Sequence, residues 1–143
     1  NINAVGLYEE LEVAKSYIAI LEIEGRDRLK VSYLIAPETL QLQIPPMLLT
    51  NLMELATRFG VLNTKEGGVI ELSTDINNDS LKIEVVHNTK ALISKQRQVL
   101  ENTLRQRLKL LYGSNASYIA NYEIDKNTLT VLLPINSIKT TIA

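Results

Sequence analysis

The chain has no cysteine and only one histidine among its 143 residues. Without cysteine it can form no disulfide, no zinc-thiolate site and no cysteine nucleophile, although the redox compartment stays open. One histidine cannot supply both the ligands of a metal site and a catalytic base, and the sequence contains no serine-elbow, zinc-protease or phosphate-loop motif. The sequence therefore predicts no catalytic residue and no metal site.

Long apolar runs and a large excess of charge of one sign are also missing. There is no run of about 18 apolar residues and no secretion signal, so we expect a soluble domain without direct membrane contact. Lysine and arginine total 15 against 16 acidic residues. Such a balance gives no overall field that would attract DNA, RNA or an anionic membrane. We therefore expect no nucleic-acid partner.

The hydrophobic content is 45%, enough in a chain of this length to bury one substantial core. We accordingly expect a single domain over residues 1–143. Its opening, "NINAVGLYEELEVAK", has no initiating Met and passes at once into a helical pattern. This indicates a fragment of a longer protein.

Two periodicities alternate along the chain. Helical spacing of apolar residues begins at Leu7, after Pro45 and at Ser94, whereas residues 29–35 alternate as a half-buried strand does. Two hairpins are expected over residues 67–88 and 116–135. We expect Leu48, Leu52 and Leu55 to pack over strands containing Ile70, Leu72, Ile83, Val85, Val131 and Leu133. This order of elements favours an α+β fold, with helices on one face of a mixed, largely antiparallel sheet.

The helix expected over residues 94–112 mixes apolar and basic residues. Its apolar side is expected to contain Val99, Leu104, Leu108 and Leu111. Its basic residues are expected to form a solvated rim, made of Lys95, Arg97, Arg105, Arg107 and Lys109.

Three stretches together resemble a known family. "LYEELEVAKSYIAI" precedes "DRL", "IPPMLL" leads into "ELATRFG", and "RQRLKLLYG" follows a variable segment. In this order the chain resembles, over nearly its whole length, the ATPase domain of LytS-type sensor histidine kinases of the GHKL superfamily. The resemblance implies a two-layer α/β sandwich of the Bergerat type, with ATP held between sheet and helices under a flexible lid. It also implies the cytoplasmic domain of a membrane-anchored receptor, with an upstream dimerisation helix and a response regulator as partners, and a possible homodimer.

The first nucleotide motif of that family is altered. The family pattern Glu-Asn-Ala-x-Lys-His-Gly aligns with residues 54–60, and its magnesium-binding asparagine is replaced by Leu55. Magnesium takes oxygen ligands, and leucine has none. Asn51 lies one helical turn earlier and could supply an oxygen, or it could make only a local hydrogen bond. Glu54 and Arg58 are the other residues of this helix that a retained site would use.

The second motif, Asp-Asn-Gly, is altered at two of its three positions. His87 replaces the adenine-binding aspartate, and Thr89 replaces the glycine that lets the backbone approach the base. A neutral imidazole carries no negative charge, and a β-branched residue makes close approach costly. Only Asn88 matches. We expect His87 to be an exposed histidine at a strand end, because the family's phosphorylated histidine lies on a helix upstream.

The third motif, Gly-x-Gly-Leu-x-Asn, supplies backbone N–H groups to the phosphates. Here Leu100 and Thr103 stand at the second glycine and the asparagine, and no glycine occurs between Gly68 and Gly113. We expect the lid segment, residues 88–98, to be the most mobile internal part of the chain.

Two functions are consistent with these motifs. The first is a degenerate ATPase-like domain that binds no cofactor and serves as a regulatory or interaction module. The second is a working domain that binds Mg-ATP through Asn51, Glu54, Arg58 and Asn88 and phosphorylates an upstream histidine. The sequence alone leaves enzymatic activity open between them.

Overall fold

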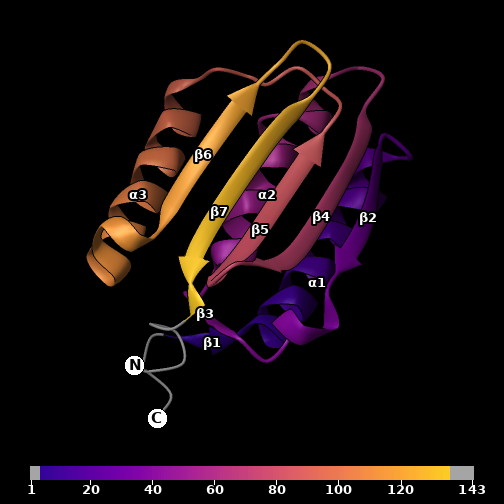
Figure 1. Cartoon of the computed structure of the whole chain (residues 1–143). Helices are drawn as coiled ribbons and strands as arrows, with labels where there is room; N and C mark the ends of the chain where they lie inside the picture. The colour runs from indigo at the N-terminus through magenta and orange to yellow at the C-terminus, as the bar shows by residue number, and fades with distance from the viewer. Residues whose placement is uncertain (1–3, 136–143) are drawn as a thin grey trace.

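Three α-helices and a five-stranded sheet make up most of the computed structural model, which describes residues 4–135 (Figure 1). The helices are α1 (Leu7–Gly25), α2 (Leu48–Arg58) and α3 (Lys95–Tyr112). The long strands are β2 (Leu29–Ile35), β4 (Gly68–Asn77), β5 (Ser80–His87), β6 (Ser117–Tyr122) and β7 (Asn127–Pro134). Three short 3-10 turns are η1 (Pro37–Thr39), η2 (Val61–Asn63) and η3 (Gly113–Asn115).

The long strands lie in the order β2-β4-β5-β7-β6. β2 and β4 are parallel, whereas β4–β5, β5–β7 and β6–β7 pair antiparallel, so the sheet is mixed and mainly antiparallel, as predicted. Two further strands, β1 (Val5–Gly6) and β3 (Gln43–Ile44), form a separate small sheet. These two were not predicted, because two residues are too short to show an alternating pattern.

The helices cover one face of the sheet and leave the other face open (Figure 1). Leu48, Leu52 and Leu55 of α2 each have an exposed fraction of 0%. The strand residues expected beneath them are also buried, with exposed fractions of 1% or less: Ile70, Leu72, Ile83, Val85, Val131 and Leu133. The two-layer α+β architecture expected from the sequence is therefore confirmed.

A glycine fixes the turn that leads into β4. Gly67 has φ +74, and a Cβ atom there would lie 2.0 Å from the carbonyl oxygen of Arg28. The next amide, of Gly68, donates to that same oxygen at 2.8 Å. Any larger residue would push β4 away from the start of β2, so the parallel pair depends on this glycine.

The helix α3 presents a different face to the core from the one predicted. Leu104 and Leu108 are buried as expected, but Val99 is 59% exposed and Arg97 is 0% exposed. The buried stripe continues backwards from Leu104 in helical steps to Glu101 and Arg97. Predicting Val99 as a core residue and Arg97 as part of a solvated rim was therefore wrong, because a buried charged pair continues the stripe in place of apolar side chains.

No helix within residues 4–135 is long and apolar enough to cross a bilayer.

Candidate functional site

The helix α2 carries the residues that align with the first nucleotide motif. It begins two residues after Pro46, because Met47 adopts a left-handed conformation with φ 70. Leu55 lies entirely in the core, whereas Asn51 and Glu54 are half-buried and Arg58 is exposed. Glu54 forms an ion pair with Arg58 one turn later. The position aligned with the magnesium ligand is therefore apolar and closed to solvent, and the charged residues of α2 pair with each other.

His87 is buried rather than exposed, so that prediction was wrong. It ends β5, and its exposed fraction is 1%. Residues of β5 alternate between the two faces, and His87 continues the inward row of Leu81, Ile83 and Val85. Its Nδ1 lies 2.8 Å from the hydroxyl oxygen of Thr89. Burial, and then the positive charge of Arg97, lower the pKa of His87 from 6.5 to about 4, so the imidazole is neutral at pH 7.

A second buried polar residue lies directly across from His87. Asn127 is its cross-strand partner on β7 and is 0% exposed. The Asn127 side-chain amide donates to the carbonyl oxygen of Thr89. His87 Nε2 and Asn127 Oδ1 have no hydrogen-bond partner among the residues that the structure describes. The sequence placed residue 127 in a turn and gave no sign of this pair.

Asn88, the one retained residue of the second motif, extends the strand ladder. Its side-chain Oδ1 accepts a hydrogen bond from the Val69 amide at 2.9 Å. Its own amide donates to the Val69 carbonyl at 3.3 Å. The Asn88 side chain therefore joins the end of β5 to the start of β4, and it takes no part in the ion pair of Glu54 and Arg58 on α2. Of the four residues that a retained site would use, Glu54 and Arg58 form an ion pair with each other, whereas Asn88 bonds to Val69.

Arg97 fills the space between α3, β6 and the end of α2. Its guanidinium donates from Nη1 to the Phe59 carbonyl at 3.2 Å, and from Nη2 to the Tyr122 hydroxyl at 2.7 Å. Its Nε lies 3.4 Å from Glu101 Oε1. The same guanidinium stacks 4.6 Å from the centre of the Tyr122 ring. Each of its three nitrogens therefore has a partner within the chain.

The carboxylate of Glu101 completes this cluster. Its Oε2 accepts hydrogen bonds from the hydroxyls of Tyr118 at 2.6 Å and Tyr122 at 2.8 Å. Burial, followed by the hydrogen bond to Glu101, raises the pKa of both tyrosines, so both remain protonated donors at neutral pH. We call Arg97, Glu101, Tyr118 and Tyr122 the Arg97 cluster.

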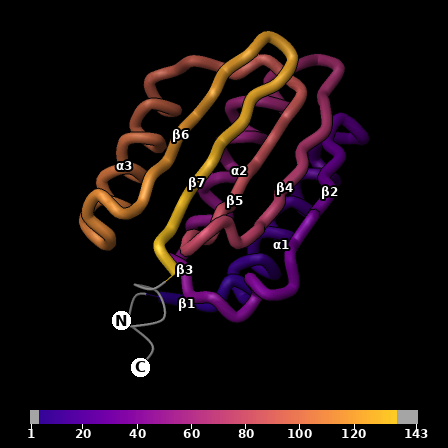
Figure 2. Tube along the Cα trace, in the orientation of Figure 1, coloured from indigo at the N-terminus to yellow at the C-terminus, as the bar shows by residue number. Residues whose placement is uncertain are grey.

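The lid segment is attached to α2 at two points. It crosses from β5 to α3 at the end of the sheet where β6 turns into β7 (Figure 2). The Leu92 amide donates to the Phe59 carbonyl at 2.8 Å, and Arg97 binds the same oxygen. Residues 95–98 are helical, and Leu100 is half-buried and packs against the core. These contacts attach the lid segment to the end of α2, and the mobility expected for residues 88–98 stays a prediction.

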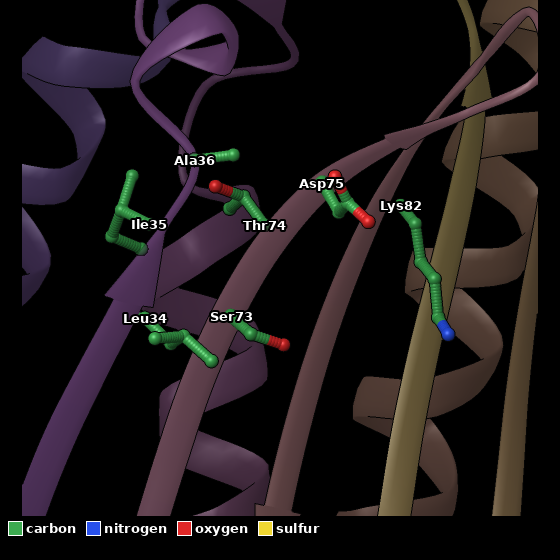
Figure 3. Close-up of a pocket in the computed structure, with 7 residues that line it drawn as sticks. All are labelled: Leu34, Ile35, Ala36, Ser73, Thr74, Asp75 and Lys82. Carbon is green, nitrogen blue, oxygen red and sulfur yellow. The ribbon is translucent and has the colours of Figure 1, made fainter.

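A hollow lies at the opposite end of the sheet. It has a volume of about 330 Å³ and is lined by the ends of β2 and β4, with Lys82 of β5 at its rim (Figure 3). Asp75 and Ser73 point toward it, but Lys82 pairs with Glu84 at 3.6 Å. No group of three or more metal-ligating side chains occurs anywhere in residues 4–135.

No protein-family model matches the sequence, and no curated protein is similar to it at the level of sequence. Solved structures are similar in fold. The catalytic domain of histidine kinase ThkA, in a nucleotide-free form, matches with a TM-score of 0.73 and 11% identity, over 92% of this chain and 96% of that domain. The chain has the fold of a histidine kinase catalytic domain.

Two further structures give the same result. The histidine kinase AdeS of Acinetobacter baumannii matches with a TM-score of 0.67 and 8% identity, over 94% of this chain and 68% of that one. The histidine kinase domain of the blue-light-activated kinase EL346 from Erythrobacter litoralis matches with a TM-score of 0.67 and 17% identity, over 97% of this chain and 70% of that one. At such identities the likeness is one of fold.

Sequence reasoning missed the Arg97 cluster as well as the buried pair of His87 and Asn127. A signal was present, because Arg97 and Glu101 are oppositely charged and four residues apart, in helical phase with Leu104 and Leu108. Such pairs usually lie on solvated faces, so the spacing alone does not distinguish a buried pair from an exposed one.

Proposed function

We propose that the chain is the ATPase-like domain of a LytS-type sensor histidine kinase that does not bind Mg-ATP and serves as a regulatory or interaction module. The observation that carries this proposal is the fully buried Arg97, which joins α3 to the carbonyl end of α2 at Phe59. The resemblance assigns the phosphate-wrapping lid to this part of the chain. All three nitrogens of Arg97 are paired within the chain, so Arg97 is not free to bind a phosphate, and the exposed Lys90 and Lys95 are the remaining cations of the lid segment.

Residue-level chemistry supports the same proposal. Leu55 offers no oxygen to magnesium, and His87 is neutral where the motif has a carboxylate. Each missing charge-assisted contact is worth roughly 1.5–3 kcal/mol. Two such losses weaken affinity by about a hundredfold or more, since a factor of ten corresponds to about 1.4 kcal/mol.

Thermal unfolding of the chain with and without millimolar ATP and magnesium tests the proposal. A ligand present at 100 times its dissociation constant adds about 2.7 kcal/mol of stability. For a chain of this size that corresponds to a rise in Tm of roughly 10 °C. We expect no rise, while a histidine kinase catalytic domain with intact motifs serves as the positive control. A magnesium-dependent rise would overturn the proposal.

One observation favours the alternative, a working ATP-binding domain. His87 Nε2 and Asn127 Oδ1 are buried polar atoms without a partner in the described part of the chain, and such atoms are uncommon in native proteins. They could bind the polar edge of a base if the lid opened. In that case Asn51, Glu54, Arg58 and Asn88 would form the rebuilt nucleotide site, and ATP with magnesium would raise the Tm.

The proposed role implies its partners. As a module of a membrane-anchored cytoplasmic kinase, the domain would contact an upstream dimerisation helix and, through it, a second copy of the protein and a response regulator. If sequence ahead of residue 1 is found, it tests this point: a histidine on a helix there would favour the catalytic alternative, and its replacement would favour the regulatory role.

A further inference from the structure

The strand β6 is an open edge of the sheet. It pairs with β7 on one side, and within residues 4–135 no strand pairs with its other side. Its six residues, "SYIANY", contain no charge and no proline. Native sheets usually protect such edges with lysine, proline or a bulge, because an open edge pairs readily with another extended chain.

The hydrogen-bonding pattern shows which backbone groups of β6 are free to pair. The Glu123 amide donates to the Lys126 carbonyl at 3.0 Å, and this pair continues the β6–β7 register. Hydrogen-bonded pairs alternate in an antiparallel ladder, so Asn121 and Ile119 bond toward β7. The backbone N–H and C=O groups of Tyr118, Ala120 and Tyr122 therefore point away from β7, toward the open edge.

A groove runs beside this edge. It has a volume of about 430 Å³ and lies between α3 and the start of β6, which are adjacent in Figure 1. Leu108, Ala116 and Tyr118 form its apolar floor. Arg105 and Lys109, one helical turn apart on α3, are its charged residues, and neither forms an ion pair within residues 4–135.

We propose that this groove binds an acidic, extended peptide segment of a partner protein, which adds to β6 as a further strand. Alternate side chains of an added strand point to opposite faces of the sheet. Acidic side chains on the α3 side would meet Arg105 and Lys109. Apolar side chains on the other face would lie beside Ile119, which is 57% exposed. The preferred segment therefore alternates acidic and apolar residues. Addition of a peptide strand to an exposed sheet edge is a binding mode known from other peptide-binding domains.

A second copy of the chain fits this edge less well. A symmetric dimer through β6 would place the same patch on both sides of the interface. Arg105 and Lys109 of one copy would then approach those of the other, and like charges at an interface disfavour association. The basic residues therefore favour an acidic partner over self-association.

The inference deepens the interaction role proposed above, by naming the partner's chemistry. It is tested by fluorescence anisotropy with a labelled peptide of ten residues that alternates valine and glutamate. We expect this peptide to bind the wild-type chain. Two control peptides should not bind: one that alternates valine and lysine, and a valine–glutamate peptide that is N-methylated at alternate residues.

Variants locate the binding. Reversing both charges, Arg105→Glu with Lys109→Glu, should weaken binding by at least about tenfold, because attraction becomes repulsion. The matched control, Lys30→Glu with Lys65→Glu, makes the same charge change at exposed positions outside the groove and should leave binding unchanged. Ala120→Pro removes one outward N–H and should also weaken binding, whereas edge strands tolerate proline at such a position. Thermal melts of each variant verify folding.

Three outcomes would overturn the inference: no binding of the glutamate peptide, equal binding of the lysine peptide, or self-association in sedimentation that Ala120→Pro abolishes. A rise in Tm with Mg-ATP would refute the proposed function and leave the groove standing, so the two failures are distinguishable.

Discussion

Replacing Arg97 with methionine should be among the most destabilising single changes in this protein. Methionine keeps much of the length and apolar volume of the side chain, but it removes all three nitrogens that bind Phe59, Tyr122 and Glu101. The Phe59 carbonyl and the Glu101 carboxylate stay buried after the change. The substitution therefore reports on the buried charged contacts rather than on a cavity.

The magnitude follows from what is left behind. Removing one partner of a buried ion pair costs about 3–5 kcal/mol, because the other charge stays buried and unpaired. Here Glu101 keeps hydrogen bonds from Tyr118 and Tyr122, so we expect about 3 kcal/mol, at the lower end. Removing both charges, with Arg97→Met and Glu101→Gln together, should cost less than Arg97→Met alone, because no unpaired charge remains.

Urea denaturation of the four proteins in this cycle measures the free energy of unfolding. Lys95→Met serves as a control, since it removes an exposed cation from the first turn of the same helix and should change stability by no more than about 0.5 kcal/mol. A loss of under about 1 kcal/mol for Arg97→Met, or a double variant less stable than Arg97→Met alone, would refute the view that a buried charged pair holds α3 against α2.

Four further predictions concern other parts of the chain. The pKa of His87 is about 4 in the folded state and 6.5 in the unfolded state, so its neutral form contributes stability above pH 6.5 that is lost as pH falls from 6.5 toward 4. The expected loss of unfolding free energy is about 3 kcal/mol. The unfolding free energy of the wild type should therefore fall more steeply between pH 6.5 and 4 than that of His87→Gln, and parallel pH curves for the two proteins would contradict this prediction. Gly67→Ala should destabilise the protein by about 2 kcal/mol or more, because the new Cβ would lie 2.0 Å from a backbone oxygen. Gly113→Ala is the control: Gly113 has a similar φ of +63 but no atom within 4 Å of the added Cβ, so this change should cost only about 1 kcal/mol. Equal losses of unfolding free energy in urea denaturation would contradict the steric argument. In hydrogen exchange the Leu92 amide should be protected more than its lid neighbours, since it donates at 2.8 Å to Phe59, and uniform fast exchange would restore the mobile lid. Leu55→Asn, which restores the motif asparagine, should lower the unfolding free energy by about 1–3 kcal/mol, because it buries an amide in the core. The variant should also show no Tm shift with Mg-ATP. A Tm shift would show that Leu55 alone blocks nucleotide binding.

The fold could be predicted from the sequence where long periodic segments recur. The strands over residues 80–87 and 127–134 alternate without interruption between buried and half-buried positions, and their inward rows are almost wholly apolar. The short β1 and β3 strands could not be predicted, because they exist only through pairing with each other. Local pattern therefore determined the layers, and tertiary pairing determined the remainder.

The site was harder to predict because its polar residues are buried. His87 and Asn127 end and begin strands whose other inward positions are apolar, so their burial follows from the register between β5 and β7, which the sequence does not display. The sequence places Arg97 on a solvated basic rim because a row of charges on a helix is usually exposed. The burial of Arg97 depends on three partners: Phe59 just past α2, Glu101 on α3 and Tyr122 on β6. Phe59 and Tyr122 lie far from Arg97 in the sequence, so the sequence does not reveal these contacts.

The contact between Arg97 and Phe59 joins the end of α2 to α3. The last carbonyls of a helix lack partners within that helix, and a cation near them is favoured by the helix dipole. Arg97 and the Leu92 amide both bind the Phe59 carbonyl, just past the last residue of α2, and Leu55 of α2 is buried in the core. A nucleotide site must instead keep polar groups free until its ligand arrives. In this chain Arg97 and Glu54 are already paired with other residues, so restoring a single motif residue would leave these contacts in place.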